Sequence, residues 1–275
     1  MDLNQAILYA QLVDAAYAVA PNNTANVSGQ SVTAGAAKYD VITSIFADDL
    51  STDLNPNRGN TRVSIGFVLQ ASTAGDVVVA IRGTEGIQEW IHDAQFLPCP
   101  CPFMPSGGQT EDGFTDMYRS LRTGLDTGSP TLTQALPKLQ FPRAVTSVTI
   151  CGHSLGGALA TLLALDVAVN TNFTPTVYTY ASPRTGDPQF ASAYNHAVPN
   201  TTRLASRLDL VPKLPLPPLY EHVLGLNELN SATLVPPKIL IKPELACLHI
   251  LPSYLYLLSL QAGGTVLPLR PECTP

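Results

Sequence analysis

The five-residue pattern at 152–156, which reads Gly-His-Ser-Leu-Gly, can do chemistry because it places a serine between two glycines. The β-branched run Val148–Ile150 precedes the pattern, and a small apolar helical pattern leaves from Gly157. A strand, a sharp turn and a helix in this order lift the serine hydroxyl above a sheet and turn backbone N–H groups towards it. Glycines fit here because so tight a turn leaves no room for neighbouring side chains. The pattern therefore predicts a nucleophile at Ser154.

A serine hydroxyl attacks well only when a histidine takes its proton and a carboxylate fixes the tautomer of that histidine. With this type of turn, the acid and then the base follow the serine along the chain. We favour Asp209 as the acid because it directly follows the predicted strand Arg203–Arg207. Asp187 is the rival, but it lies in a Gly-Asp-Pro turn, where an aspartate ordinarily caps a helix. Asp166 falls within a predicted helix and is interpreted as a solvated residue.

Two histidines follow the predicted acid, His222 and His249. We favour His249 as the base and expect it on a loop just before an apolar helix at Tyr254–Leu260. His222 is interpreted as a partly exposed loop residue. His153, beside the nucleophile, is expected to pack and hydrogen-bond under the turn.

Acyl transfer at a serine builds an oxyanion, which needs donors of its own. One expected donor is the N–H of Leu155, directly after the nucleophile. The second is expected from Thr84, in the Arg82-Gly83-Thr84 segment that follows the predicted strand Val77–Ile81, because Thr84 offers both an N–H and a hydroxyl.

A short amphipathic helix is predicted after this second donor. Ile87, Trp90, Ile91 and Ala94 have the spacing i, i+3, i+4, i+7. Such a stripe ordinarily packs on a core. Its place between the donor and a Pro/Cys/Gly-rich loop favours a movable lid over the serine, formed by Ile87, Trp90 and Ile91.

The elements that must hold these residues alternate along the chain. Apolar periodicity predicts strands at 39–46, 62–70, 76–82, 148–150, 176–180 and 203–207, and helices at 2–19, 112–125, 132–139, 157–169, from 188 through 194, and 254–260. This order predicts an α/β fold with a mainly parallel sheet and helices on both faces. Since there is no internal repeat and no linker of shifted composition, we expect a single domain over residues 1–275.

The composition narrows the class of protein. Of 275 residues, 45% are hydrophobic and only 13% are charged, the net charge is −6, and no cluster of Lys and Arg occurs. The charged fraction is well under the roughly 25% typical of soluble domains, and a nucleic acid is excluded as a partner. No apolar run is long enough to span a membrane. Low charge and 24 prolines fit an extracellular protein that works at apolar interfaces.

The cysteines leave their pairing open. Cys247 and Cys273 can tie down the C-terminal tail in an oxidising compartment. Cys151 lies in a predicted buried strand and is expected to be a free core thiol. The spacing of Cys99 and Cys101 fits no common zinc motif, and a bond between them would be strained.

Four Asn-x-Ser/Thr sequons favour a secreted glycoprotein; they begin at Asn22, Asn26, Asn172 and Asn200. The first residues, Met-Asp-Leu-Asn, have no basic or apolar leader segment. We therefore expect a mature secreted chain whose signal peptide is absent, with an added initiator methionine; a cytosolic protein is the alternative.

Further motifs occur beside the serine pattern: Ala-Ile-Arg-Gly-Thr at 80–84, Glu-Trp-Ile at 89–91, Asp-Gly-Phe at 112–114, Tyr-Ala-Ser-Pro-Arg-Thr-Gly-Asp at 180–187 and Asp-Leu-Val-Pro at 209–212. From about Val63 to Leu258 the chain resembles the class 3 lipases, the filamentous-fungal triacylglycerol lipase family of the Rhizomucor and Thermomyces type. The resemblance implies an α/β-hydrolase fold with a short helical lid. It also implies a triacylglycerol lipase with the triad Ser154, Asp209 and His249 and an oxyanion hole formed by Thr84 and Leu155. It implies no cofactor and no metal, a lipid or ester substrate at an oil–water interface, and no stable protein partner.

Two features depart from that family or leave alternatives open. Many relatives have a histidine before the Gly-Phe helix start, where this chain has Glu111-Asp112. Leu214–Leu251 is rich in leucine and proline, which fits a rim of an acyl pocket, a lipid-contact surface or a packed flap. A feruloyl esterase or another carboxylesterase of the same fold is the alternative activity. A non-catalytic binding protein is disfavoured because a candidate residue exists for every catalytic role.

Overall fold

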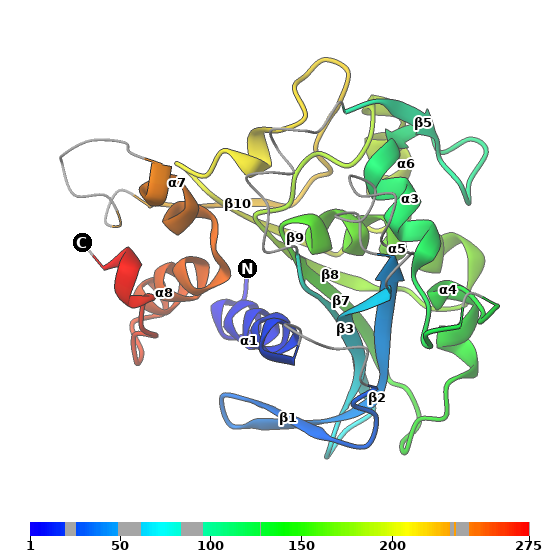
Figure 1. The fold of residues 1–275 in the computed structure, drawn as a ribbon, viewed down its shortest axis with the longest axis horizontal. Helices are drawn as coiled ribbons and strands as arrows, with labels where there is room; N and C mark the ends of the chain where they lie inside the picture. The colour runs from blue at the N-terminus through cyan, green and yellow to red at the C-terminus, as the bar shows by residue number, and fades with distance from the viewer. Residues whose placement is uncertain are drawn as a thin grey trace, which may run out of the picture.

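The centre of the fold is an eight-stranded sheet with the strand order β1-β2-β3-β4-β7-β8-β9-β10 (Figure 1). The computed structural model describes residues 1–19, 26–48, 62–83, 96–126, 128–231, 234 and 242–274. The described strands are β1 (Ser31–Ala34), β2 (Ala37–Asp48), β3 (Arg62–Ala71), β4 (Asp76–Ile81), β5 (Pro98–Pro100), β6 (Gln109–Glu111), β7 (Ser147–His153), β8 (Thr176–Tyr180), β9 (Thr201–Ser206) and β10 (Leu226–Leu229). Strands β5 and β6 form a separate two-stranded sheet.

The direction of the strands divides the large sheet into two parts. Neighbours from β4 through β7, β8 and β9 to β10 are parallel. Neighbours from β1 to β4 are antiparallel. The parallel strands β4 and β7 are runs of valine, isoleucine and other small residues that are buried on both faces, as parallel strands usually are. The predicted α/β class with a mainly parallel sheet is confirmed.

Helices cover both faces of this sheet (Figure 1). The described helices are α1 (Leu3–Val19), α3 (Asp112–Ser120), α4 (Leu132–Ala135), α5 (Leu155–Asn170), α6 (Pro188–Ala197), α7 (Lys242–His249) and α8 (Leu251–Ala262), with 3₁₀ turns at Leu136–Lys138, Val211–Lys213 and Pro271–Cys273. One core joins α3, α4, α5 and α6 to one face, and the other joins α1 and α8 to the opposite face. Alternate residues of β4 supply the two cores, because successive side chains of a strand point to opposite faces: Val77 and Val79 enter the first core, and Val78 and Ala80 enter the second.

Several elements differ from the sequence prediction. The helix predicted to reach residue 125 ends at Ser120, because Leu121 turns to ψ 122° and Arg122 then pairs with Phe46. Strands β1, β5, β6 and β10 were not predicted. They are only three or four residues long, too short for a clear period.

The cysteines have the bonding states that the sequence favoured. Cys247 and Cys273 form a disulfide, and Cys151 is buried and free. Cys99 and Cys101 are free as well.

Three of the four sequon asparagines, Asn26, Asn172 and Asn200, are exposed, and Asn22 lies outside the described residues. None of the helices in the described ranges has the length and apolar character needed to cross a membrane.

Candidate active site

Ser154 lies at the apex of a strained turn between β7 and α5. Its backbone has φ 59° and ψ −127°, and its N–H donates to the carbonyl of Tyr180 at 2.9 Å. A positive φ is costly for a residue with a side chain and is found where surrounding structure enforces it. The turn is so tight that backbone atoms lie where the flanking glycines would carry a Cβ. A Cβ on Gly152 would lie 2.1 Å from the carbonyl oxygen of Gly156, and a Cβ on Gly156 would lie 2.4 Å from that of Arg82.

The structure brings the three predicted triad residues together in a buried cluster. His249 Nε2 lies 2.8 Å from Ser154 Oγ, and His249 Nδ1 lies 2.9 Å from Asp209 Oδ2. The exposed fractions are 1% for Ser154, 2% for Asp209 and 5% for His249. Since a carboxylate oxygen can only accept, Nδ1 carries the proton and Nε2 is free to accept from the serine hydroxyl. This arrangement can activate a serine.

Asp209 is held by more than the histidine. The hydroxyl of Tyr254, on α8, donates to Asp209 Oδ2 at 2.8 Å and accepts the N–H of Ser206 at 2.9 Å. The N–H of Val211 donates to the other oxygen, Oδ1, at 3.0 Å. Burial and the charge of Asp209 hold the pKa of Tyr254 well above its usual 10, so the hydroxyl stays a donor. Tyr254 was not among the predicted site residues, although the aromatic residues of the helix after His249 were a signal.

The base lies on a different element than expected. His249 is the last residue of α7 rather than part of a loop, and α8 begins two residues later. The disulfide joins Cys247, in the same last turn of α7, to the C-terminal 3₁₀ turn. The disulfide therefore ties the turn that carries His249 to the C-terminal tail.

His153 lies under the turn, as predicted. It is buried, its Nε2 lies 2.8 Å from the carbonyl oxygen of His249, and its Nδ1 lies 2.7 Å from the hydroxyl of Tyr17. Burial and the neighbouring His249 hold the pKa of His153 well below its usual 6.5, so it is a neutral imidazole.

Of the two expected oxyanion donors, only Leu155 lies within the described residues. Leu155 is the first residue of α5, so its N–H has no acceptor within the helix and lies directly beside Ser154. Thr84 and the expected lid residues Ile87, Trp90 and Ile91 lie outside the described residues.

The rival residues have structural roles. Asp187 caps α6 by accepting the N–H of Phe190 at 2.7 Å, as predicted. His222 is partly buried, and its Nε2 donates to the carbonyl of Pro212 at 2.5 Å. Burial first, and then the charge of Arg203, lower the pKa of His222 to about 3. Neither residue joins the Ser154 cluster.

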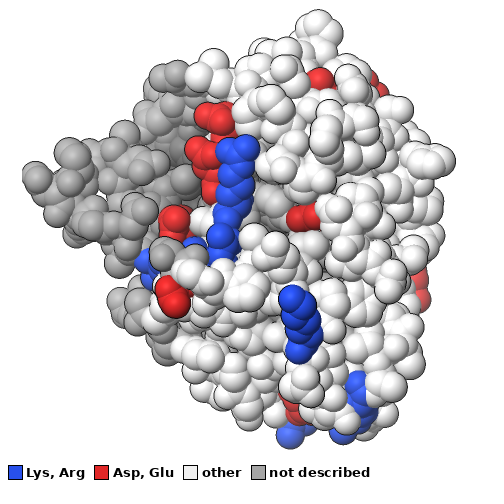
Figure 2. Space-filling model, turned by 90° about the vertical axis from the view of Figure 1, so that its right-hand side faces the viewer, with Lys and Arg blue, Asp and Glu red and all other residues white. Residues whose placement is uncertain are grey.

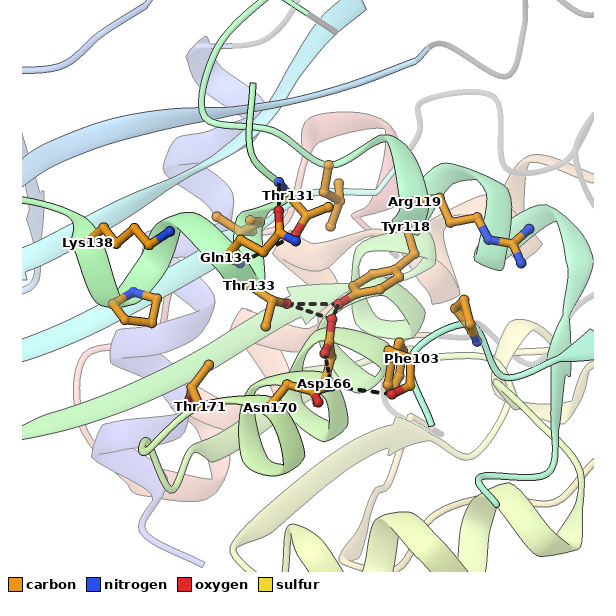
Figure 3. A pocket seen from close by; sticks show the side chains of 14 residues that line it. Phe103, Tyr118, Arg119, Thr131, Thr133, Gln134, Lys138, Asp166, Asn170 and Thr171 are labelled. Carbon is orange, nitrogen blue, oxygen red and sulfur yellow. Dashed lines mark hydrogen bonds between the residues drawn. The ribbon is translucent and has the colours of Figure 1, made fainter. Parts of the chain in front are cut away.

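The interpretation of Asp166 as a solvated residue is wrong. Its Oδ2 accepts the hydroxyls of Tyr118 and Thr133, the latter at 2.8 Å, and its Oδ1 accepts the amide of Asn170 at 2.6 Å (Figure 3). Asp166 is 8% exposed because α3 and α4 both pack over this part of α5. It borders a cavity of about 620 Å³ whose wall also includes Phe103. This cavity lies about 18 Å along α5 from the nucleophile, and its acidic residue is already satisfied by hydrogen bonds within the chain.

The loop after β9, at 207–225, exposes several leucines beside the charged residues Arg207, Lys213 and Glu221. Its exposed leucines are Leu210, Leu216, Leu219 and Leu224, and Leu226 at the start of β10 is exposed as well. Arginine and histidine side chains donate hydrogen bonds to the backbone carbonyls of this loop. Arg184 donates to Lys213 and Pro215, and Arg203 donates to Val223. His222 donates to Pro212. The loop, yellow in Figure 1, rises above the carboxyl ends of the parallel strands, and the uppermost part of the face in Figure 2 carries no Lys or Arg. This part of the leucine-rich segment therefore exposes several leucines, while Pro215, Tyr220 and Val223 between them are buried.

Within the described ranges, no group of three or more His, Cys, Asp or Glu side chains has an arrangement that would hold a metal ion.

Comparison with known proteins identifies relatives of this sequence. A family model described as "Lipase (class 3)" matches residues 78–218. The "Secreted mono- and diacylglycerol lipase A" of Penicillium cyclopium is 31% identical over 179 residues, which cover 65% of this chain and 52% of that protein. The "Lipase" of Rhizomucor miehei is 32% identical over 154 residues, which cover 54% of this chain and 40% of that protein. The chain spans about half the length of the curated relatives it matches.

A solved structure gives the same result for the fold. The mono- and diacylglycerol lipase from Aspergillus oryzae superposes with a TM-score of 0.63 at 26% identity, over 81% of this chain and 78% of that chain. This likeness confirms the α/β-hydrolase fold that the sequence resemblance implied.

Proposed function

The chain belongs to the class 3 lipase family, and from that premise we propose that it hydrolyses carboxylic esters of acyl lipids through an acyl-enzyme on Ser154. The observation that carries the proposal is the buried contact of 2.8 Å between Ser154 Oγ and His249 Nε2, with Asp209 at 2.9 Å on the other side of the imidazole. A hydroxyl, a neutral imidazole and a carboxylate in this order are the arrangement that activates serine for acyl transfer.

The proposed reaction has two halves. Ser154 Oγ attacks the ester carbonyl while His249 Nε2 takes its proton, and Asp209 stabilises the imidazolium that forms. The imidazolium then donates the proton to the departing alcohol, which leaves an acyl-serine. In the second half, His249 removes a proton from water while the water oxygen attacks the acyl carbon. His249 then returns the proton to Ser154 Oγ as the bond between Oγ and the acyl carbon breaks, and the free acid is released.

The oxyanion of each tetrahedral intermediate is proposed to be bound by the N–H of Leu155 and by Thr84. The place of Leu155 supports the first assignment, because its N–H is at the start of α5, where the helix dipole also favours negative charge. Thr84 and the lid formed by Ile87, Trp90 and Ile91 are proposed from the sequence resemblance.

For the substrate we propose triacylglycerols at an oil–water interface. The exposed leucines beside Asp209 support an apolar substrate surface, since Leu210 directly follows the acid and is 49% exposed. Mono- and diacylglycerols are the second candidate class, because a 31% identical relative carries that activity in its name. We also propose that the protein is secreted, which the disulfide and the name of that relative support.

A substrate panel with a Ser154→Ala control tests the proposal. Emulsified tri-, di- and monoacylglycerols, p-nitrophenyl esters of increasing chain length, and methyl ferulate would be assayed side by side. Release of fatty acid from emulsified triacylglycerol, lost in Ser154→Ala, is expected. Release of ferulate without attack on acylglycerols would instead indicate the feruloyl esterase alternative. If Ser154→Ala kept its ester hydrolysis, the serine mechanism would be wrong.

A further inference from the structure

Behind the triad, a second chain of hydrogen bonds links four separate segments of the protein. The N–H of Gly83, after β4, donates to the hydroxyl of Tyr17 at 2.8 Å. That hydroxyl, on α1, lies 2.7 Å from His153 Nδ1, and His153 Nε2 lies 2.8 Å from the carbonyl oxygen of His249. Tyr17 and His153 are 136 positions apart, and His153 and His249 are 96 apart.

The donor and the acceptor of each hydrogen bond in this series follow from the chemistry of its groups. A carbonyl oxygen can only accept, so His153 Nε2 must carry a proton and donate to His249. A buried, neutral imidazole carries one proton, so Nδ1 accepts, and the hydrogen between it and Tyr17 belongs to the tyrosine. The Tyr17 oxygen in turn accepts the N–H of Gly83. The carbonyl of His249 therefore fixes the tautomer of His153, and Tyr17 supports that tautomer by donating to Nδ1.

The packing around this chain is tight. A Cβ at Gly83 would lie 2.8 Å from the Tyr17 hydroxyl and 2.9 Å from both the His153 carbonyl oxygen and Ser154 Cβ. The imidazole of His153 also faces that of His249, with ring centroids 5.0 Å apart. A change in the tautomer or tilt of His153 would therefore disturb its contacts with the backbone of His249 and, through Tyr17, with Gly83, the neighbour of the proposed oxyanion donor Thr84.

We propose that Tyr17 and His153 are positioning residues: as a fixed-direction hydrogen-bond relay, they hold the backbone of His249 and the Gly83 segment in the geometry that Ser154 requires. This inference rests on the proposed function. It assigns a role in the reaction to α1, an element that contributes no triad residue. Hydrogen bonds that orient a reacting group from behind act in this way, because small misplacements of the reacting group slow the reaction strongly.

Histidine NMR tests the relay without any assay of activity. In protein labelled with ¹⁵N-histidine, the signals of His153 are assigned by their loss in His153→Gln. We expect a protonated Nε2 and a hydrogen-bonded, unprotonated Nδ1, and we expect the Nδ1 signal to move when Tyr17→Phe removes its donor. A proton on Nδ1, or an Nδ1 signal unchanged in Tyr17→Phe, would overturn the relay.

Kinetics on a soluble ester test the positioning role. Tyr17→Phe removes one oxygen, and we expect kcat for p-nitrophenyl butyrate to fall about tenfold while KM changes less than about twofold. Tyr178→Phe is the matched control, since its hydroxyl also contacts α1, at Gln5 Oε1 and 3.0 Å, but does not touch the relay. The control should keep the wild-type kcat. Equal kcat values in the two variants would overturn the proposal, as would a loss that appears in KM alone.

A double-mutant cycle separates a relay from two independent packing residues. If Tyr17 acts through His153, the double variant Tyr17→Phe/His153→Gln should lose no more kcat than His153→Gln alone. Multiplied losses would contradict the relay. If His153→Gln does not fold, the comparison of Tyr17→Phe with Tyr178→Phe still decides. A wild-type chain that cleaves no ester would contradict the proposed function, whereas the NMR result would still stand.

Discussion

His249 Nε2 lies 2.8 Å from Ser154 Oγ, although the two residues are 95 positions apart in the chain. The topology of the sheet produces this contact. Strand β7 ends at His153, directly before Ser154, and β9, separated from β7 only by β8, leads into the loop of Asp209 at the same edge. Carboxyl ends of parallel strands meet at one edge, which is where such folds place their ligands. Helices α7 and α8 then bring the base to the same edge.

The first prediction concerns the acid. Asp209→Asn should lower kcat by about 10⁴-fold, because an amide cannot hold the Nδ1–H tautomer of His249 or stabilise the imidazolium. Activity on p-nitrophenyl butyrate and urea unfolding would be measured together. Asp187→Asn is the control, since that side chain only caps α6. Full activity in Asp209→Asn would show that Asp209 is not the acid.

The second prediction concerns the turn. Gly156→Ala should destabilise the protein by about 3 kcal/mol or prevent folding, since its Cβ would lie 2.4 Å from two backbone carbonyl oxygens, of Ile81 and Arg82. Gly264→Ala, whose Cβ would meet nothing within 4 Å, should change stability by less than about 0.5 kcal/mol. The free energy of unfolding in urea checks both. Similar values for the two variants would mean that the close approach is not as described.

The third prediction concerns pH. Burial lowers the pKa of His222 to about 3, so above pH 6.5 both the folded and the unfolded state hold it neutral. As the pH falls from 6.5 towards 3, only the unfolded state takes up the proton, and stability is lost. His222→Gln should make the dependence of the unfolding free energy on pH shallower in this window, by up to about 1.4 kcal/mol per pH unit. Arg203 and Arg184, which face His222, contribute to the effect in the wild type.

Urea titrations between pH 7 and 4 measure this difference. The variant and the wild type should have similar slopes above pH 6.5 and diverge below it. Parallel curves over the whole range would contradict the lowered pKa of His222.

The fourth prediction concerns the disulfide, whose cysteines are 26 positions apart. Replacing both Cys247 and Cys273 by serine should lower the unfolding free energy by about 3 kcal/mol, because the unfolded chain loses a cross-link. Activity should be lost at a lower temperature than in the wild type, since Cys247 lies in the same turn of α7 as His249. Cys99→Ser removes a free thiol and serves as the control. Equal unfolding midpoints in the double variant and the wild type would show that the bond does not anchor α7.

The sequence predicted what depends on local pattern or chain order. The turn at Ser154 was predictable because its two glycines and flanking strand and helix are adjacent in sequence. Asp209 and His249 followed from the order in which acid and base succeed such a serine. Tyr17 could not be found in this way, since it reaches the site with one hydroxyl from α1, far from the triad in sequence. Tyr254 follows His249 closely in sequence, but a helical pattern does not reveal that its hydroxyl reaches Asp209. Asp166 was misinterpreted because a helical pattern does not reveal that α3 and α4 cover its face.

Peptide mapping of the acyl-enzyme tests the central proposal most directly. The protein would be treated with a fluorophosphonate, or stopped during turnover of p-nitrophenyl butyrate, then digested and analysed by mass spectrometry. The proposal predicts one adduct, on Ser154 in the peptide that contains residues 152–156, and no adduct in Ser154→Ala. An adduct on another residue, or ester hydrolysis by Ser154→Ala at the wild-type rate, would contradict it.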